Sequence, residues 1–184
     1  MTPLRHVLLT LCLSLLMVSC TPPTGKKPVV ITPTSDLQPE IAGMPAASSA
    51  EEFIAQSLKT TGDLRYQLQL KAAGMYIEQG KLEQAQEILR SIPAVSASAA
   101  SRRLLKIHSA NIAMALNQPR DALSLLTFSE ILPPAEQLVV SEIRAHAFLA
   151  VGYPLEAIKT RVQMDSLISD STRRASNQDR KSVV

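Results

Sequence analysis

The 184-residue sequence contains no tryptophan and only three phenylalanines and three tyrosines. A hydrophobic core therefore has to be built from alanine, leucine, isoleucine, valine and methionine, which suits packed helices better than sheets. The sequence also lacks a strong excess of charge, because its formal net charge is only +3. Nucleic-acid binding requires clustered lysine and arginine, so no nucleic-acid partner is expected.

Residue patterns that accompany catalysis or metal binding are missing as well. The six glycines are scattered, so there is no phosphate-binding loop, and no G-x-S-x-G motif occurs. His108 and His146 stand singly on different predicted helices, without the additional ligands of a zinc site, and we expect both at the surface or at an edge. We therefore predict that the protein is not an enzyme and has no cofactor, metal or small-molecule substrate.

Only two cysteines occur, Cys12 and Cys20. Arg5 precedes a 12-residue apolar run over residues 7–18, which is too short to cross a bilayer, where about 20 residues are needed. Residues 1–19 thus have the parts of a secretory signal peptide. Its removal would leave Cys20 alone at the new amino terminus, without a partner for an intrachain disulfide.

The stretch LMVSC (16–20) resembles the bacterial lipobox. The resemblance implies that the thiol of Cys20 carries a diacyl group, that the preceding peptide bond is cut and that the new amino group is acylated. Several acyl chains on one residue give stable anchoring, whereas a single chain gives only marginal binding. An ordinary secretory signal with a cysteine near the cut by chance is the alternative. The residue after the cysteine is Thr21 and not aspartate. In this respect the sequence resembles lipoproteins that are carried to the outer membrane of Gram-negative bacteria, where they face the periplasm.

Residues 20–47 are predicted to be a lipidated, flexible linker. Six of the twelve prolines lie between residues 21 and 50, and glycine, threonine, serine and alanine fill most of the rest. Such a segment cannot bury enough apolar surface to fold alone, and at ~3.1 Å per residue it could reach on the order of 90 Å. The apolar residues 29–31 leave open a short strand formed with a partner.

From Ser48 onward, apolar residues recur at helical spacing. Ser49 and Glu52 form a capping-box pattern that begins a short helix, and Glu51 with Glu52 is expected to be its charged first turn. A longer helix is expected over 97–116, and no strand is expected in this part of the chain. The predicted buried stripes are Leu64, Leu68, Ala72, Met75; Ala85, Ile88, Leu89, Ile92; Leu105, Ile112, Leu116; Ala122, Leu125, Leu126; Val139, Ile143, Ala147, Val151; and Ala157, Ile158, Val162, Leu167.

The turns between these helices repeat. The motifs GKLEQA (80–85), NQPRDA (117–122) and GYPLEA (152–157) lie 37 and 35 residues apart. Glycine or asparagine tolerates a left-handed turn, and the alanine lets the second helix approach the first. This period resembles the tetratricopeptide class. We therefore predict an all-α, tetratricopeptide-like solenoid of helix pairs over residues 48–170, with an irregular helical bundle as the alternative.

Two short basic pairs stand out, at residues 102–103 and 173–174. We expect both to belong to solvated helix faces, with contact to a partner as the alternative.

The stretch AEEFIAQSLKTTGDLRYQLQLKAAGMYIEQGKLEQAQEIL (50–89), together with residues 98–126 and 138–158, resembles the N-terminal domain of the LpoA/LppC lipoproteins. The resemblance covers about residues 48–175 and depends on spacing and turn residues rather than on a catalytic motif. It implies an outer-membrane lipoprotein that reaches through the cell wall and activates a class A penicillin-binding protein, without doing chemistry itself. A tetratricopeptide-type lipoprotein that assists assembly of outer-membrane proteins or pilus secretins is the alternative function.

Members of that family are longer and carry a second domain that resembles a periplasmic substrate-binding protein. This sequence ends at NQDRKSVV (177–184). We therefore expect residues 171–184 to be a polar tail, the truncated start of the missing domain. The family's contact with the synthase is assigned to that domain, so impaired activation is expected.

Overall fold

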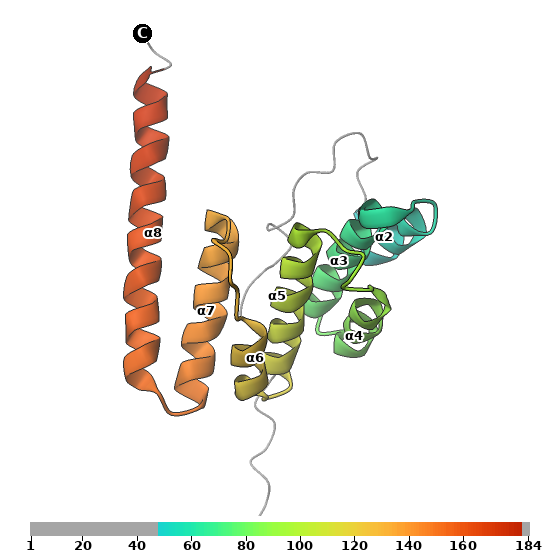
Figure 1. Cartoon of the computed structure of the whole chain (residues 1–184), viewed down its shortest axis with the longest axis horizontal. Coiled ribbons are helices and arrows are strands. Elements are labelled where there is room, and N and C mark those ends of the chain that lie inside the picture. The colour runs from blue at the N-terminus through green and yellow to red at the C-terminus, as the bar shows by residue number, and fades with distance from the viewer. Residues whose placement is uncertain (1–47, 182–184) are drawn as a thin grey trace, which may run out of the picture.

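The structure is a computed structural model that describes residues 48–181 of the chain. Within these residues the chain forms helices only, arranged as a curved row of antiparallel neighbours (Figure 1). The helices are α2 (Ala50–Ser57), α3 (Gly62–Glu78), α4 (Leu82–Ser91), α5 (Ala99–Ala115), α6 (Pro119–Leu125), α7 (Pro134–Ala150) and α8 (Pro154–Lys181). The predicted all-α class is confirmed. The signal peptide, Cys20, the linker and the strand at 29–31 lie outside the described residues.

The turns after α3, α5 and α7 share one arrangement of backbone hydrogen bonds. Gly80, Asn117 and Gly152 have positive φ angles of 73°, 58° and 85°. In each turn the following residue donates its N–H to the carbonyl five residues earlier, which is the bond that defines a Schellman C-cap. The three bonds are Lys81 N to Tyr76 O, Gln118 N to Ala113 O and Tyr153 N to Phe148 O, each 2.8 Å long. The left-handed turns predicted from the repeated motif are therefore confirmed.

The alanine that ends each motif is buried where the helices of a pair approach each other. Ala85, Ala122 and Ala157 are at most 1% exposed, and a larger side chain at these positions would push the second helix away from the first. The pairs α3–α4, α5–α6 and α7–α8 pack in sequence, and α2 packs on α3. This is the predicted tetratricopeptide-like arrangement, in which the uncovered side of one pair is buried by the next pair.

Helix α5 contributes to both hydrophobic clusters of the stack. Leu104 and Ile112 pack with residues of α3 and α4, whereas Ile107, Ala110 and Ala113 pack with residues of α6 and α7. A helix with neighbours on two sides buries more than one stripe. This explains why α5 buries more residues than the single stripe predicted for residues 97–116.

Serines cap the first turns of α2 and α5. The Ser49 hydroxyl oxygen accepts from the Glu52 N–H at 3.2 Å, as the capping-box pattern predicts. The Glu52 carboxylate accepts from the backbone N–H of Ser48 at 2.6 Å, one residue before the position expected in a capping box. That bond is the main reason why the pKa of Glu52 is lowered. Ser98 caps α5 in the same way, by accepting from the Ser101 N–H at 3.1 Å.

Two of the predicted stripes are wrong in part. Leu116 is 45% exposed, and Ile158 and Val162 are 58% and 63% exposed. Leu116 is the C-cap of α5, beyond the last residue of the helix. Helix α8 packs extensively on α7 alone among the described helices. Among residues 154–169 of α8, the buried residues are therefore the small Ala157 and Thr160, and most of the other side chains are exposed. The same helix continues to Lys181, past the predicted domain boundary at 170.

The left-handed turns allow a stability test at Gly152. Gly152→Ala is expected to lower the free energy of unfolding by about 1 kcal/mol, because an L side chain is strained in this backbone conformation. No atom lies within 4 Å of the added Cβ, so a steric clash does not contribute. Urea denaturation followed by circular dichroism measures the change. Gly152→Asn is the matched control and should lose less, because asparagine already occupies the equivalent turn at 117; equal losses would contradict the explanation.

Candidate functional site

The predicted lipidation site, Cys20, is outside the described residues, so its acylation stays a prediction. Among residues 48–181 no group of three or more histidine, cysteine and carboxylate side chains is placed to hold a metal ion. None of the helices described is both long enough and apolar enough to cross a bilayer. The side chains of the basic pair at 173–174 are likewise not described. The basic pair at 102–103, by contrast, lies on α5 among described side chains.

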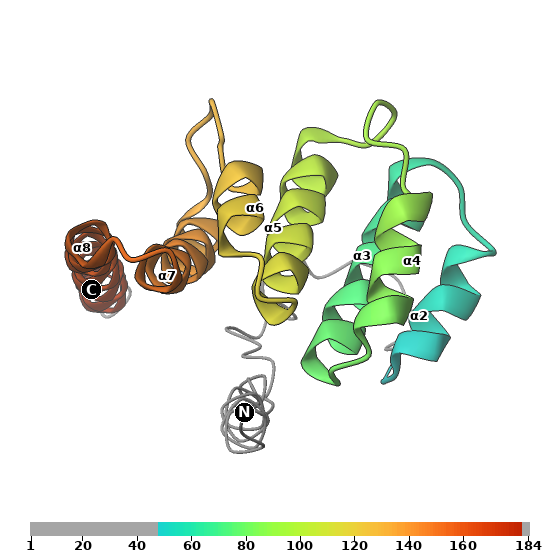
Figure 2. The ribbon, with the colours of Figure 1, turned by 90° about the horizontal axis from the view of Figure 1, so that it is seen from below.

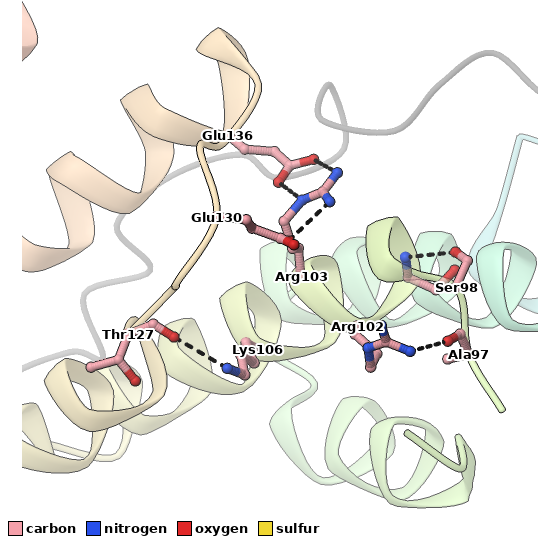
Figure 3. Close-up of polar contacts among 9 residues, drawn as sticks. Ala97, Ser98, Arg102, Arg103, Lys106, Thr127, Glu130 and Glu136 are labelled. Atoms are coloured by element: carbon pink, nitrogen blue, oxygen red, sulfur yellow. Dashed lines mark hydrogen bonds and ion pairs between the residues drawn. The ribbon is translucent and has the colours of Figure 1, made fainter. Parts of the chain in front are cut away.

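The Arg103 side chain joins α5 to the loop before α7 and to α7 itself (Figure 3). Its Nε donates to one carboxylate oxygen of Glu136 at 2.6 Å, and its Nη2 donates to the other at 3.2 Å. Its Nη1 donates to Glu130 at 3.1 Å. Side-chain exposure is 16% for Arg103 and 8% for Glu136, so this bidentate pair is largely shielded from water.

The electrostatics of the cluster follow from this geometry. The hydrogen bond to Glu136 raises the pKa of Arg103, and burial only partly opposes the change. Arg103 is therefore a permanently charged group whose single positive charge faces two carboxylates. The expectation of a solvated basic face is wrong for this residue, because its guanidinium binds side chains of its own chain.

Neighbouring cations hold the loops on either side of α5 through backbone carbonyls. Arg102 Nη1 donates to Ala97 O at 2.6 Å, in the α4–α5 loop. Lys106 Nζ donates to Thr127 O at 3.2 Å and lies 5.3 Å from the centre of the Phe128 ring, in the α6–α7 loop. These acceptors are neutral, so the positive charges of Arg102 and Lys106 are not cancelled as that of Arg103 is. Both side chains belong to exposed residues.

The three cations line one shallow depression of about 250 Å³ between α5 and the α6–α7 loop, together with Ala99, Phe128, Ser129 and Glu130. The depression has cations and an aromatic ring on its walls, and its carboxylate is already bound to Arg103. Such a surface can bind anionic groups. The contacts join residues 27 and 33 positions apart, so no local pattern in the sequence could have revealed them.

His108 was expected at the surface and is instead fully buried in α5. Burial lowers its pKa to about 4, so the imidazole is neutral at pH 7. In the structure His108 lies four residues after the buried Leu104 and seven after the buried Ser101, on the same side of the helix. His146 is half-buried on α7. Neither residue is part of a metal-binding group among the described residues.

The fold and this cluster define a tetratricopeptide-like helical domain whose loops are fixed by charged side chains of a central helix. Residues 44–182 match the profile of the family described as "LppC putative lipoprotein". Because this match covers most of the sequence, the chain belongs to that family. No curated protein matches the sequence at a significant level.

Solved structures of Haemophilus influenzae LpoA are similar to this chain. Full-length LpoA in one monoclinic form is 25% identical, with a TM-score of 0.56, over 78% of this chain and 26% of LpoA. The isolated N-terminal domain of LpoA is 25% identical, with a TM-score of 0.53, over 73% of this chain and 61% of that domain. The chain therefore spans about a quarter of the length of full-length LpoA and matches its N-terminal domain, as the sequence resemblance predicted.

The shielded ion pair gives a prediction about stability. Glu136→Gln is expected to lower the free energy of unfolding by about 2 kcal/mol, because it leaves Arg103 without its main charged partner in a poorly hydrated position. Chemical denaturation measures the change. The matched control is Glu156→Gln, which removes the exposed 2.9 Å pair with Lys159 and should cost at most about 0.5 kcal/mol. Similar losses for the two variants would show that shielding does not matter here.

The buried His108 predicts a pH dependence. The unfolded chain binds a proton near pH 6.5, whereas the folded chain binds it only near pH 4. The unfolded state therefore carries more protons between these values, and stability falls as the pH is lowered through this window, by about 3 kcal/mol in total. Unfolding free energies of the wild type and His108→Leu should diverge in slope over this range. Parallel pH profiles would exclude His108 as the cause.

Proposed function

We propose that this chain is an outer-membrane lipoprotein, facing the periplasm, that binds and activates a class A penicillin-binding protein. It acts as a regulator of peptidoglycan synthesis and does not catalyse a reaction. The observation that carries the proposal is the match of residues 44–182 to the LppC lipoprotein family. The similarity to the N-terminal domain of Haemophilus influenzae LpoA supports it.

The order of segments fits this role. A lipobox ending at Cys20 would fix the amino terminus to the membrane, and the proline-rich linker over 20–47 would let the helical body move away from it. The helical body offers an extended surface built from repeated pairs, and such surfaces are used for binding proteins.

The proposal assigns a contact with the synthase to the helical domain that the structure describes. Because the chain spans about a quarter of full-length LpoA, the proposal requires this domain to make a contact of its own. Impaired activation remains the expectation from the sequence. Binding and activation therefore have to be measured separately.

One experiment in the native cell tests anchoring and partner together. The wild type and Cys20→Ser are expressed with an affinity tag, the envelope is crosslinked, and membrane fractions and captured proteins are analysed. We expect the wild type in the outer-membrane fraction with a class A penicillin-binding protein, and the Cys20→Ser variant in the soluble periplasmic fraction with much less of it. The variant tests the thiol as the acyl carrier, because serine preserves the size of the side chain.

Two outcomes would contradict the proposal. Unchanged acyl labelling and fractionation of Cys20→Ser would refute lipidation. Capture of a secretin or a barrel-assembly protein by the wild type, without a penicillin-binding protein, would favour an assembly factor. If the synthase is captured, the purified chain is added to it with labelled lipid-linked substrate, and the rate of glycan polymerisation shows whether binding activates.

A further inference from the structure

The loops that precede α3, α5 and α7, the first helices of the three pairs, each expose an aliphatic side chain. Leu58 between α2 and α3 is 71% exposed, Val95 between α4 and α5 is 98% exposed, and Ile131 between α6 and α7 is 93% exposed. Isolated exposed aliphatic residues are common on protein surfaces. These three, however, lie 37 and 36 residues apart, close to the spacings of 37 and 35 residues between the turn motifs. They therefore occupy the same position in successive repeats.

The antiparallel arrangement places these loops on one edge of the stack. In Figure 2 the α4–α5 and α6–α7 loops extend to the upper edge, with the α2–α3 loop farther along the row. The α3–α4 and α5–α6 turns lie at the lower edge. We call the edge with Leu58, Val95 and Ile131 the loop edge.

The two loops with the most exposed residues are fixed by hydrogen bonds and ion pairs. On the amino-terminal side of Ile131, Glu130 binds Arg103. On its other side the buried Leu132 accepts through its carbonyl from the Gln137 side chain at 2.7 Å. Ile131 is thus held in solvent between two fixed neighbours.

Val95 is held in the same manner. Ser96 N donates to Pro93 O at 3.1 Å, closing a turn around Val95. Ser98 N donates to the Asp63 carboxylate of α3 at 2.7 Å. Val95 and Ile131 are therefore exposed in loops whose conformation is fixed by hydrogen bonds.

Positive charge accompanies the exposed aliphatic residues on the loop edge. Lys59 follows Leu58, and Arg102 and Lys106 lie beside the next two loops; all three are exposed. Arg102 and Lys106 donate to neutral carbonyls, so their charges remain available. Of the carboxylates in the same region, Asp63 accepts from the neutral Ser98 and Gln67 groups and keeps its charge, whereas Glu130 and Glu136 face the single positive charge of Arg103. The four cations Lys59, Arg102, Arg103 and Lys106 thus exceed these three carboxylates by one.

We propose that the loop edge is a membrane-contact surface, in which Leu58, Val95 and Ile131 enter the interface of a bilayer and Lys59, Arg102 and Lys106 bind anionic phospholipid headgroups. Aliphatic side chains flanked by lysine and arginine are the combination that lies in such an interface. The contact is weak alone. It becomes effective when a lipid anchor raises the local concentration of the surface at the membrane.

A lipid surface fits these residues better than a protein partner does. Val95 and Ile131 are almost fully exposed, and neither lines the depression at Arg102 and Lys106. A fluid interface accepts isolated projecting side chains without a matching shape. A second copy of this chain would present the same exposed cations to Arg102 and Lys106, which opposes self-association.

Vesicle binding tests the proposal. The chain from residue 20 onward, with Cys20→Ser so that no acyl group is attached, is mixed with vesicles of phosphatidylethanolamine with or without phosphatidylglycerol. We expect binding to vesicles that contain phosphatidylglycerol, and weaker binding in high salt. Val95→Ser with Ile131→Ser should lower the partition coefficient about tenfold, because two aliphatic side chains no longer enter the interface.

The matched control is Leu155→Ser with Ile158→Ser on α8. These residues are also exposed, at 61% and 58%, but they lie outside the loop edge, so binding should be unchanged. Circular dichroism and thermal unfolding check that both pairs of substitutions leave the fold intact. Equal effects of the two pairs, or no binding to either kind of vesicle, would overturn the proposal.

The absence of tryptophan provides a second readout. Ile131→Trp introduces a single indole at the loop edge, and Leu155→Trp introduces one on α8. On addition of phosphatidylglycerol vesicles, fluorescence should shift to shorter wavelength for the first variant only, because an indole favours the interface. A shift for both variants, or for neither, contradicts the proposed orientation. Concentration-dependent dimerisation that Val95→Ser with Ile131→Ser abolishes would assign the loop edge to self-association instead.

Discussion

The architecture depends on one backbone hydrogen bond, repeated three times, from the residue after a left-handed glycine or asparagine to the carbonyl five residues earlier. This bond ends the first helix of each pair and turns the chain back along it. The alanine that follows lets the second helix pack closely. Since every pair reverses direction in the same way, all connections between pairs come to one edge, and the exposed loop residues share an edge for that reason.

Helix α5 connects the two halves of this stack. Its apolar residues belong to both hydrophobic clusters, and its first two turns supply the cations that fix the loops on either side. Because the Arg103–Glu136 pair is shielded, the cost of desolvation offsets much of its attraction. The pair joins the first turn of α7 to α5, and Glu130 joins the α6–α7 loop to the same arginine. The same helix buries His108, a polar group at the centre of the domain. One element thus sets the core and the geometry of the surface.

The parts of this fold that were predictable are those encoded locally. The turn motifs, the Ser49 cap and the buried alanines each depend on residues within a few positions of one another, and all are present in the structure. Burial of His108 and pairing of Arg103 depend on which helices pack against α5, and their partners come from distant parts of the chain. Ile158 and Val162 have helical spacing, yet exposure follows because α8 has one extensive neighbour among the described helices. The family was recognisable because spacing and turn residues define it.

Extensive contacts in this domain run almost entirely between elements that follow closely along the chain, from α2 with α3 to α7 with α8. The stability of a linear array of this kind is approximately the sum of the stabilities of its units and of the contacts between adjacent units. A substitution within one unit is therefore felt by the flanking units and fades beyond them. The loop edge and the opposite edge of the stack can therefore carry different surface residues in each repeat. Such differences leave the packing between the pairs, and hence the curvature of the stack, unchanged.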